Sequence, residues 1–197
     1  MNYDIQETDL AQAIKLRRST KPDKMNGQVI DDKDVNELLS LADWAPTHAR
    51  TEPWRFIVYD SAKVKDFTKE HAELFKANTN PESFTQMKYD NLVNLGNNVS
   101  HVIIAWMKRI ENHKIPEIEE VSATACAVQN ILLGATGKGI ASFWSTGGMV
   151  HNPAFRSFLK LGDEDRVLGV LYLGYSDNTL REGMRMIPLA DKIQWVK

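Results

Sequence analysis

The hydrophobic residues of this 197-residue chain recur with helical spacing in six separate stretches. In the second of them, Val35, Leu38, Leu39 and Ala42 lie at i, i+3, i+4 and i+7, which places them along one apolar stripe of a helix. Pro46 has no N–H to donate to the preceding turn, so this helix must end just before it. The same reasoning predicts the other helices at residues 8–20, 61–78, 82–95, 117–138 and 152–161.

The stretch at residues 117–138 differs from the others because its middle, from Ala123 to Ala135, is small or aliphatic nearly all round. A helix without a polar face is buried. We therefore expect it either in the centre of the domain or against a twin helix from another subunit. Cys126 belongs to this packing surface, and we assign it no catalytic role.

Four shorter stretches rich in β-branched and aromatic residues predict strands at residues 55–59, 102–107, 140–144 and 166–175. Residues 102–107 show no polar alternation, which is typical of a strand that is covered on both faces. Helices and strands are interleaved, but the strands are few and short for two βαβ halves. We therefore predict an α+β fold in which a mixed central β-sheet is sandwiched by helices.

The length of the chain predicts one domain over residues 1–197. Its last part, residues 176–197, sustains no hydrophobic period and is interrupted by Gly183 and Pro188. This C-terminal extension nevertheless ends in apolar residues that include Trp195 and Val196. We expect such a tail to be docked, across a partner subunit, rather than loose.

Composition and charge narrow the classes of protein. The chain is 43% hydrophobic and 25% charged with a net charge of −2, which predicts a globular protein without a basic surface for nucleic acid or membranes. Its single cysteine cannot form an internal disulfide, and this favours a reducing compartment. Neither a signal peptide nor an apolar run of about 20 residues is visible. We expect a cytoplasmic protein.

The loop from Trp44 to Trp54 concentrates two tryptophans, two prolines, a histidine and an arginine between a predicted helix and a predicted strand. Pro46 and Pro53 reduce the entropy that the loop loses on ordering, which suits a loop that holds a ligand. Two interpretations remain open from the loop alone. It is either the rim of a cofactor site that presents His48, or a stiff connection whose tryptophans fill the core.

The segment Arg17-Arg18-Ser19-Thr20 has two interpretations as well. Positive charge at the end of a helix complements the negative end of its dipole, and this alone could explain both arginines. Two guanidinium groups followed by two hydroxyls could also bind the oxygens of a phosphate without a glycine-rich loop. A second polar segment, Ser145-Thr146-Gly147-Gly148, follows a predicted strand and leaves room for a ligand to approach closely.

Other chemistries find little support. Gly134 to Gly139 closes a helix instead of opening one, so it is neither a dinucleotide fingerprint nor a phosphate-binding loop. No nucleophile elbow is present, and the histidines lack the spacing of metal ligands, so no metal site is predicted. The histidines are His48, His71, His101, His113 and His151. A basic hydroxyl-rich patch, an aromatic loop with a histidine and a Trp-Ser-Thr-Gly turn together suit a flat, phosphorylated cofactor.

These segments also resemble, in the same order, the signature of the FMN-dependent nitroreductase family. The resemblance begins with Arg17-Arg18-Ser19, continues with Ala45-Pro46-Thr47-His48 and Pro53-Trp54-Arg55-Phe56, and ends with residues 111–116, 143–147 and 170–174. The last three stretches are similar to those of short, minimal bacterial members. The match runs from about Leu10 to Asp177.

The resemblance implies a homodimer that binds two FMN molecules at its subunit interface. By position, Arg17, Arg18 and Ser19 would hold the phosphate and ribityl chain of FMN. Trp44 and His48 would reach the flavin from the partner subunit. The flavin ring would be lined by Trp144, Ser145 and Thr146.

The resemblance also implies an activity. Family members reduce FMN with NADH or NADPH and then pass electrons to nitroaromatic compounds, quinones or related acceptors, in a ping-pong mechanism. Because the flavin carries the redox chemistry, we assign no residue as a catalytic acid or base. The alternatives are an FMN-binding carrier or redox sensor without significant turnover, and a helical interaction module without a cofactor.

Three positions depart from the family pattern. Arg50 and Glu52 stand where many relatives have Asn and Gln, and Ser145 replaces an arginine found in some close relatives. A carboxylate near a ring that gains electrons disfavours the reduced anion unless Arg50 pairs with it. These departures bear on the flavin potential and on the acceptor rather than on FMN binding.

Overall fold

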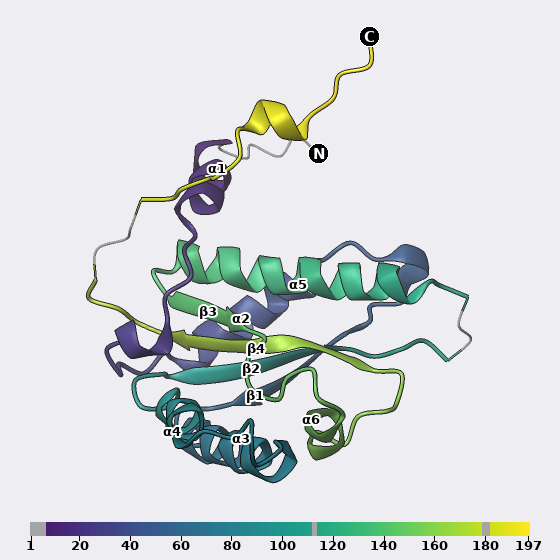
Figure 1. Cartoon of the computed structure of the whole chain (residues 1–197). Coiled ribbons are helices and arrows are strands. Elements are labelled where there is room, and N and C mark those ends of the chain that lie inside the picture. The colour runs from purple at the N-terminus through teal and green to yellow at the C-terminus, as the bar shows by residue number, and fades with distance from the viewer. Residues whose placement is uncertain (1–6, 112–113, 179–181) are drawn as a thin grey trace.

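The computed structural model describes residues 7–111, 114–178 and 182–197, so Asn112 and His113 of the quoted motif lie outside it. Its centre is a four-stranded sheet in the order β1-β2-β4-β3 (Figure 1). The strands are β1 (Trp54–Tyr59), β2 (His101–Met107), β3 (Ala141–Ser145) and β4 (Arg166–Gly174). Their three pairings are antiparallel. A parallel bridge between Ser19 and Ser142 adds a parallel contact at the β3 edge.

Helices cover both faces of this sheet. One face carries α2 (Asp32–Ala42) and α5 (Glu117–Gly137), and the other carries α3 (Val64–Asn78), α4 (Gln86–Asn94) and α6 (Pro153–Phe158) (Figure 1). Three short 3-10 helices, η1 (Pro22–Lys24), η2 (His48–Arg50) and η3 (Leu189–Lys192), lie in the connections. The predicted α+β class, with a central sheet between helical layers, is confirmed.

The hydrophobic core consists of one cluster on each face of the sheet. Along β2, Ile103 and Ala105 belong to the cluster under α2 and α5, whereas Val102 and Ile104 belong to the cluster over α3 and α6. All four are fully buried, as expected for a strand whose side chains alternate between two covered faces. Each such aliphatic side chain contributes about 1.5–3 kcal/mol of burial free energy. Because both faces of β2 are covered, its sequence shows no polar alternation.

Two predicted helix starts were wrong. The helix expected from Ser61 begins at Val64, because the Asp60 carboxylate accepts the backbone N–H groups of residues 62 and 63 in a turn. The helix expected from residue 82 begins at Gln86, because the Thr85 hydroxyl accepts the backbone N–H of Lys88 at 3.3 Å. In both cases a short polar side chain closes a turn ahead of the helix.

The longest helix, α5, is not buried all round as its sequence predicts. Ala127, Val128 and Ile131 pack on the sheet and are fully buried. On the opposite side of the helix, Ile118 is 69% exposed and Cys126 is also exposed. Burial in the centre of the domain therefore accounts for only one face of α5.

The first helix and the tail project together from one end of the molecule (Figure 1). α1 (Glu7–Leu16) leaves Leu10 and Ile14 about half exposed, at 55% and 50%. The tail is attached where the Asn26 side chain donates to the Asp177 carboxylate at 2.8 Å. Beyond this point its apolar side chains are open to solvent, including Trp195 at 81%. Both segments thus expose apolar surface that the other described residues leave uncovered.

Candidate functional site

The segment that follows α1 is joined to the start of β3. Ser19 forms the parallel bridge with Ser142, and the backbone N–H of Thr20 donates to the Ser142 carbonyl at 2.9 Å. β3 then ends with Trp144 and Ser145. Two predicted cofactor segments, separated by more than one hundred residues in the sequence, are thereby brought to the same edge of the sheet.

The two arginines of this segment have different surroundings. The Arg18 guanidinium donates to the carbonyls of Lys15 at 2.6 Å and Arg17 at 2.8 Å, so it caps the end of α1. The tail also crosses it closely, because a Cβ placed on Gly183 would overlap the guanidinium. Arg18 therefore shows the interaction with the helix end that its sequence position suggests.

The side chain of Arg17 is partly buried and makes no hydrogen bond or ion pair with any of the described residues. Its backbone N–H continues the helical pattern by donating to the Ala13 carbonyl at 2.9 Å. Ser19, two residues on, is exposed. A guanidinium with open donors beside an exposed hydroxyl has the chemistry that an anionic group requires.

The indole of Trp144 lies over the neighbouring strand. Its Nε1–H donates to the Leu168 carbonyl at 3.0 Å, and its ring takes the space that a Cβ on Gly169 would need. Gly169 has φ 156°, a conformation that side chains rarely adopt. Trp144 packs with the core cluster under α5, whereas Phe143 packs with the opposite cluster. Because side chains alternate along a strand, Trp144 and Ser145 leave the sheet on different faces.

The turn after β3 is held from below by a buried histidine. Thr146 to Gly148 are exposed, but Met149 is buried, and its backbone N–H donates to Nε2 of His71 on α3 at 2.9 Å. His71 is 2% exposed, and burial lowers its pKa to about 4. No pattern in the sequence around either residue indicates this contact across 78 residues.

The two tryptophans of the loop from Trp44 to Trp54 have different surroundings. Trp54 is buried and donates its Nε1–H to the Asp43 carboxylate at 3.0 Å, so it fills the core. Trp44 is 84% exposed. His48, in η2, has an exposed side chain as well. One tryptophan therefore anchors the loop, and the other is presented to solvent.

The same loop contains three residues other than glycine with left-handed backbone conformations, namely Ala49 at φ 50°, Arg50 at 56° and Glu52 at 42°. Each costs about 1–2 kcal/mol relative to a right-handed conformation. Such strain persists only where surrounding contacts fix the backbone, and it is concentrated at functional sites. Arg50 and Glu52 form no ion pair with each other among the described residues. Neither the strain nor the missing pair could be predicted from sequence.

The loop is held in place by the first turn of α5. Nδ1 of His48 and the Glu119 carboxylate lie 2.5 Å apart. Two neighbouring carboxylates of the same turn bind other segments. Glu117 pairs with Arg166 at the start of β4. The fully buried Glu120 pairs with Arg109, which follows β2. Negative charge is favourable at a helix N-terminus, so this turn can join three segments at once.

Within one chain, the predicted cofactor residues form two separate groups. His48 lies near the first turn of α5, whereas Arg17 and Ser19 lie near Ser142, which follows the last turn. A helix of 21 residues is about 30 Å long, and this separation is too large for one flavin to bridge. The chain alone therefore brings together the segments at residues 17–19 and 144–146, but not His48.

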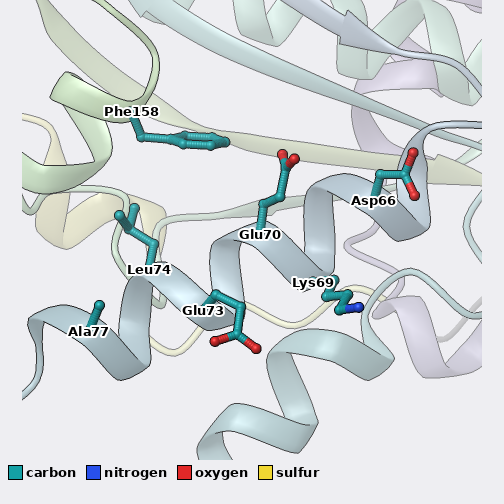
Figure 2. A pocket seen from close by; sticks show the side chains of 7 residues that line it. All are labelled: Asp66, Lys69, Glu70, Glu73, Leu74, Ala77 and Phe158. Carbon is teal, nitrogen blue, oxygen red and sulfur yellow. The ribbon is translucent and has the colours of Figure 1, made fainter.

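An open groove of about 580 Å³ lies elsewhere, on the outer side of α3 (Figure 2). Its lining comes from α3 and α6 and consists of Asp66, Lys69, Glu70, Glu73, Leu74, Ala77 and Phe158. Three carboxylates against one ammonium group disfavour an anionic ligand. The groove shares no residue with the predicted cofactor segments.

Comparison with known proteins identifies the family. The model described as "Nitroreductase family" matches residues 14–175, which is most of the chain. The chain belongs to the nitroreductase family. Residues 17–19, 44–54 and 144–146 all lie within the matched range, and so do all four strands.

Individual nitroreductases agree with this assignment over nearly the whole chain. YfhC of Bacillus subtilis (strain 168), whose name assigns it to the NAD(P)H nitroreductases, is 27% identical over 187 residues, which are 95% of this chain and 94% of YfhC. A solved nitroreductase-like family protein from Bacillus cereus is 26% identical with a TM-score of 0.77, covering 95% of this chain and 96% of its own.

A third relative was solved with a ligand. This nitroreductase-fold protein from Desulfovibrio desulfuricans, in complex with FMN, is 21% identical with a TM-score of 0.70, and covers 95% of this chain and 96% of its own. The protein described here is thus an oxidoreductase of the nitroreductase family. No helix among its described residues is long and apolar enough to cross a membrane.

Proposed function

We propose that this nitroreductase binds FMN and uses NADH or NADPH to reduce nitroaromatic compounds, quinones or related small acceptors in a ping-pong cycle. The observation that carries the proposal is the bridge between Ser19 and Ser142, which places Arg17 beside the strand that ends in Trp144 and Ser145. The FMN complex of the Desulfovibrio desulfuricans relative and the name of YfhC support the choice of cofactor and electron donor.

The residues at this edge fit the chemical demands of FMN. Arg17 would bind the phosphate through its open guanidinium donors, and Ser19 would add a hydroxyl. Arg18, which already caps α1, would contribute positive charge rather than its full set of donors. Trp144 would offer an aromatic surface on the α5 face of the sheet, and Ser145 and Thr146 would offer hydroxyl groups at the end of β3.

When bound, FMN supplies the chemistry that accepts electrons from the nicotinamide and passes them to the acceptor. The residues of this chain bind and orient it. We assign no acid or base among them, because the histidine nearest to these segments, His71, is buried under the turn and faces its backbone.

We also propose that the protein is a homodimer whose subunits complete each other's flavin site. His48 lies too far along α5 to reach the flavin of its own chain, but a second chain packed on α5 could place it there, together with the exposed Trp44. The exposed face of α5 with Ile118 and Cys126 would be covered in this arrangement. FMN at the interface would then require both subunits.

The tail supports the same proposal. Its exposed apolar side chains are Met184, Met186, Ile187, Leu189, Ile193, Trp195 and Val196. A stretch of this kind is unfavourable in water and is typical of a segment that docks on a partner. We propose that residues 176–197 are an extension, docked on the dimer, of a single domain spanning residues 1–197, and that the protein functions in the cytoplasm.

The absorption spectrum of the purified protein tests the cofactor. We expect a yellow protein, or a colourless one that becomes yellow when FMN is added. Under anaerobic conditions the flavin band should bleach on addition of NADH or NADPH and return when a quinone or a nitroaromatic compound is added. A protein that binds FMN but is not bleached by either nucleotide would instead be the alternative, a flavin carrier or redox sensor. A protein that takes up no FMN would contradict both.

Light scattering coupled to size exclusion tests the dimer. We expect twice the 22.4-kDa mass of the chain. Because Cys126 is the only cysteine, a short bifunctional maleimide should link two subunits through α5 if the two helices pack together. The variant Cys126→Ser is the matched control and should remain unlinked. A monomeric mass at micromolar concentration would exclude a flavin site shared between subunits.

A further inference from the structure

The turn between β3 and α6 rests on the imidazole of His71. The backbone N–H of Met149 donates to Nε2 of His71 at 2.9 Å. Gly148, with φ 67°, lies so close that a Cβ at this position would be 2.7 Å from the same nitrogen. Within the turn, the backbone N–H of Gly147 donates to the Ser145 hydroxyl at 3.3 Å, which is a long hydrogen bond. The contact to His71 is therefore the stronger of these two hydrogen bonds, and the Met149 carbonyl in addition accepts from the backbone N–H of Asn152 at 2.8 Å.

The surroundings of His71 hold the imidazole in one orientation and one tautomer. It packs against the rings of Phe67 and Phe155, whose centroids are 5.7 and 4.8 Å away and which also pack against each other, and it is 2% exposed. To accept from Met149, Nε2 must carry no proton, so Nδ1 carries it. Nδ1 is buried and has no hydrogen-bond partner among the described residues. A buried donor without a partner is unfavourable, and its presence calls for a compensating role.

Packing alone does not require a histidine here. The cluster around it is apolar and aromatic, so a leucine or phenylalanine would fill the space without leaving a buried N–H unpaired. What a leucine or phenylalanine would not supply is an acceptor, packed against two aromatic rings, that points at the backbone of the turn. The same turn contains Ser145 and Thr146, which are the proposed flavin contacts.

We propose that His71 is a positioning residue for the cofactor site, and that its hydrogen bond to Met149 fixes the Ser145–Gly148 turn in the conformation that receives the flavin ring. This inference rests on the proposed FMN function. His71 does not touch the cofactor in this role. It acts through the backbone of the turn, from the α3 side of the sheet.

The test compares two substitutions in the full-length protein. His71→Leu fills the space but removes the acceptor, whereas His71→Gln keeps an oxygen that can accept from Met149. His101→Gln is the matched control, because His101 is equally buried, at 1%, but bonds to Ser100 and Asp32 on the face of the sheet under α2. Two quantities are measured: the hydrogen-exchange rate of the Met149 amide without FMN, and the dissociation constant of FMN.

For His71→Leu we expect exchange at Met149 and the FMN dissociation constant each to rise about 10-fold or more, because the backbone N–H loses its partner. In His71→Gln and in His101→Gln both quantities should stay within about 3-fold of the wild type. Unchanged values in His71→Leu would overturn the proposal. Equal losses in His71→Leu and His71→Gln would also overturn it, because they would assign the effect to packing rather than to the acceptor.

A second variant covers the case in which His71→Leu does not fold. Gly148→Ala places a methyl group against Nε2 of His71 and strains the backbone, so it should displace the turn and weaken FMN binding about 10-fold while α3 stays intact. Normal FMN affinity in this variant would contradict the proposal. The exchange measurement needs no flavin. A wild-type protein that fails to bind FMN would therefore refute the proposed function and the cofactor role of His71, whatever the exchange at Met149.

Discussion

The indole of Trp144, on β3, packs directly against the backbone of Gly169 on the neighbouring strand β4. The Nε1–H of Trp144 donates to the carbonyl of Leu168, the residue just before this glycine. The contact fixes the aromatic ring that we propose for one side of the flavin site. It also explains why a glycine stands in the middle of the most hydrophobic strand.

Replacing Gly169 with alanine should therefore move Trp144. The added methyl group would overlap the indole, and φ 156° is unfavourable for alanine, so we expect a loss of about 1–3 kcal/mol in the free energy of unfolding. Tryptophan fluorescence and urea denaturation measure the two effects. Gly137→Ala is the matched control, because open space surrounds that position at the end of α5. Equal stability of Gly169→Ala and the wild type would show that the indole is free to shift.

Arg17 and Arg18 should respond differently to substitution by alanine. Arg17→Ala removes a guanidinium without protein partners among the described residues, so it should weaken FMN retention far more than it lowers the melting temperature of the apoprotein. Arg18→Ala removes a cap of α1 and should lower the melting temperature of the apoprotein. Thermal melts with and without FMN separate the two effects. Unchanged FMN affinity in Arg17→Ala would leave Arg17 as only a partner of the helix dipole.

The stability of the protein should depend on pH through His71. Its pKa is about 4 in the folded chain against an ordinary 6.5, so between these values the unfolded chain binds a proton that the folded chain does not. Stability is full above pH 6.5 and falls as the pH drops toward 4, by about 3 kcal/mol in total. Urea denaturation between pH 4 and 7 should show this component in the wild type. His71→Gln, which cannot titrate, should lack it; identical pH profiles would contradict the assignment.

The strained loop should tolerate glycine where its backbone is left-handed. Ala49→Gly relieves an unfavourable φ of 50°, and we expect a change in the free energy of unfolding between zero and about +1 kcal/mol. Ala77→Gly, on the exposed side of α3, should lower it by about 1 kcal/mol. Chemical denaturation of the two variants provides the comparison. A loss at Ala49 as large as that at Ala77 would mean that the backbone at residue 49 is not left-handed in solution.

The sequence predicted those elements whose cause lies within a few residues. The apolar stripe of α2 shows which of its sides is covered, and the unbroken apolar run of β2 shows that both of its faces are covered. The end of α2 follows from Pro46. The ordered motifs likewise indicated the family. All of these signals are local, either as periodicity or as a short run of residue types.

The features that the sequence did not predict depend on contacts between residues far apart in the chain. The pairing of His48 with Glu119 joins residues 71 positions apart, and no pattern in either segment predicts it. The left-handed backbone of Ala49 is imposed by such contacts, because alanine has no preference for it. The apolar side of α1 predicts a helix correctly but does not indicate that Leu10 and Ile14 stay about half exposed in the chain.

The length of α5 limits where residues can be inserted or deleted in this sequence. Its first turn holds the loop that contains His48, and its last turn leads into β3. Each residue of a helix advances it by about 1.5 Å and turns it by about 100°. Adding or deleting a single residue within α5 would rotate Glu119 away from His48 or turn β3 away from Ser19. Gains and losses of residues should therefore be restricted to the loops, while α5 keeps its register from end to end.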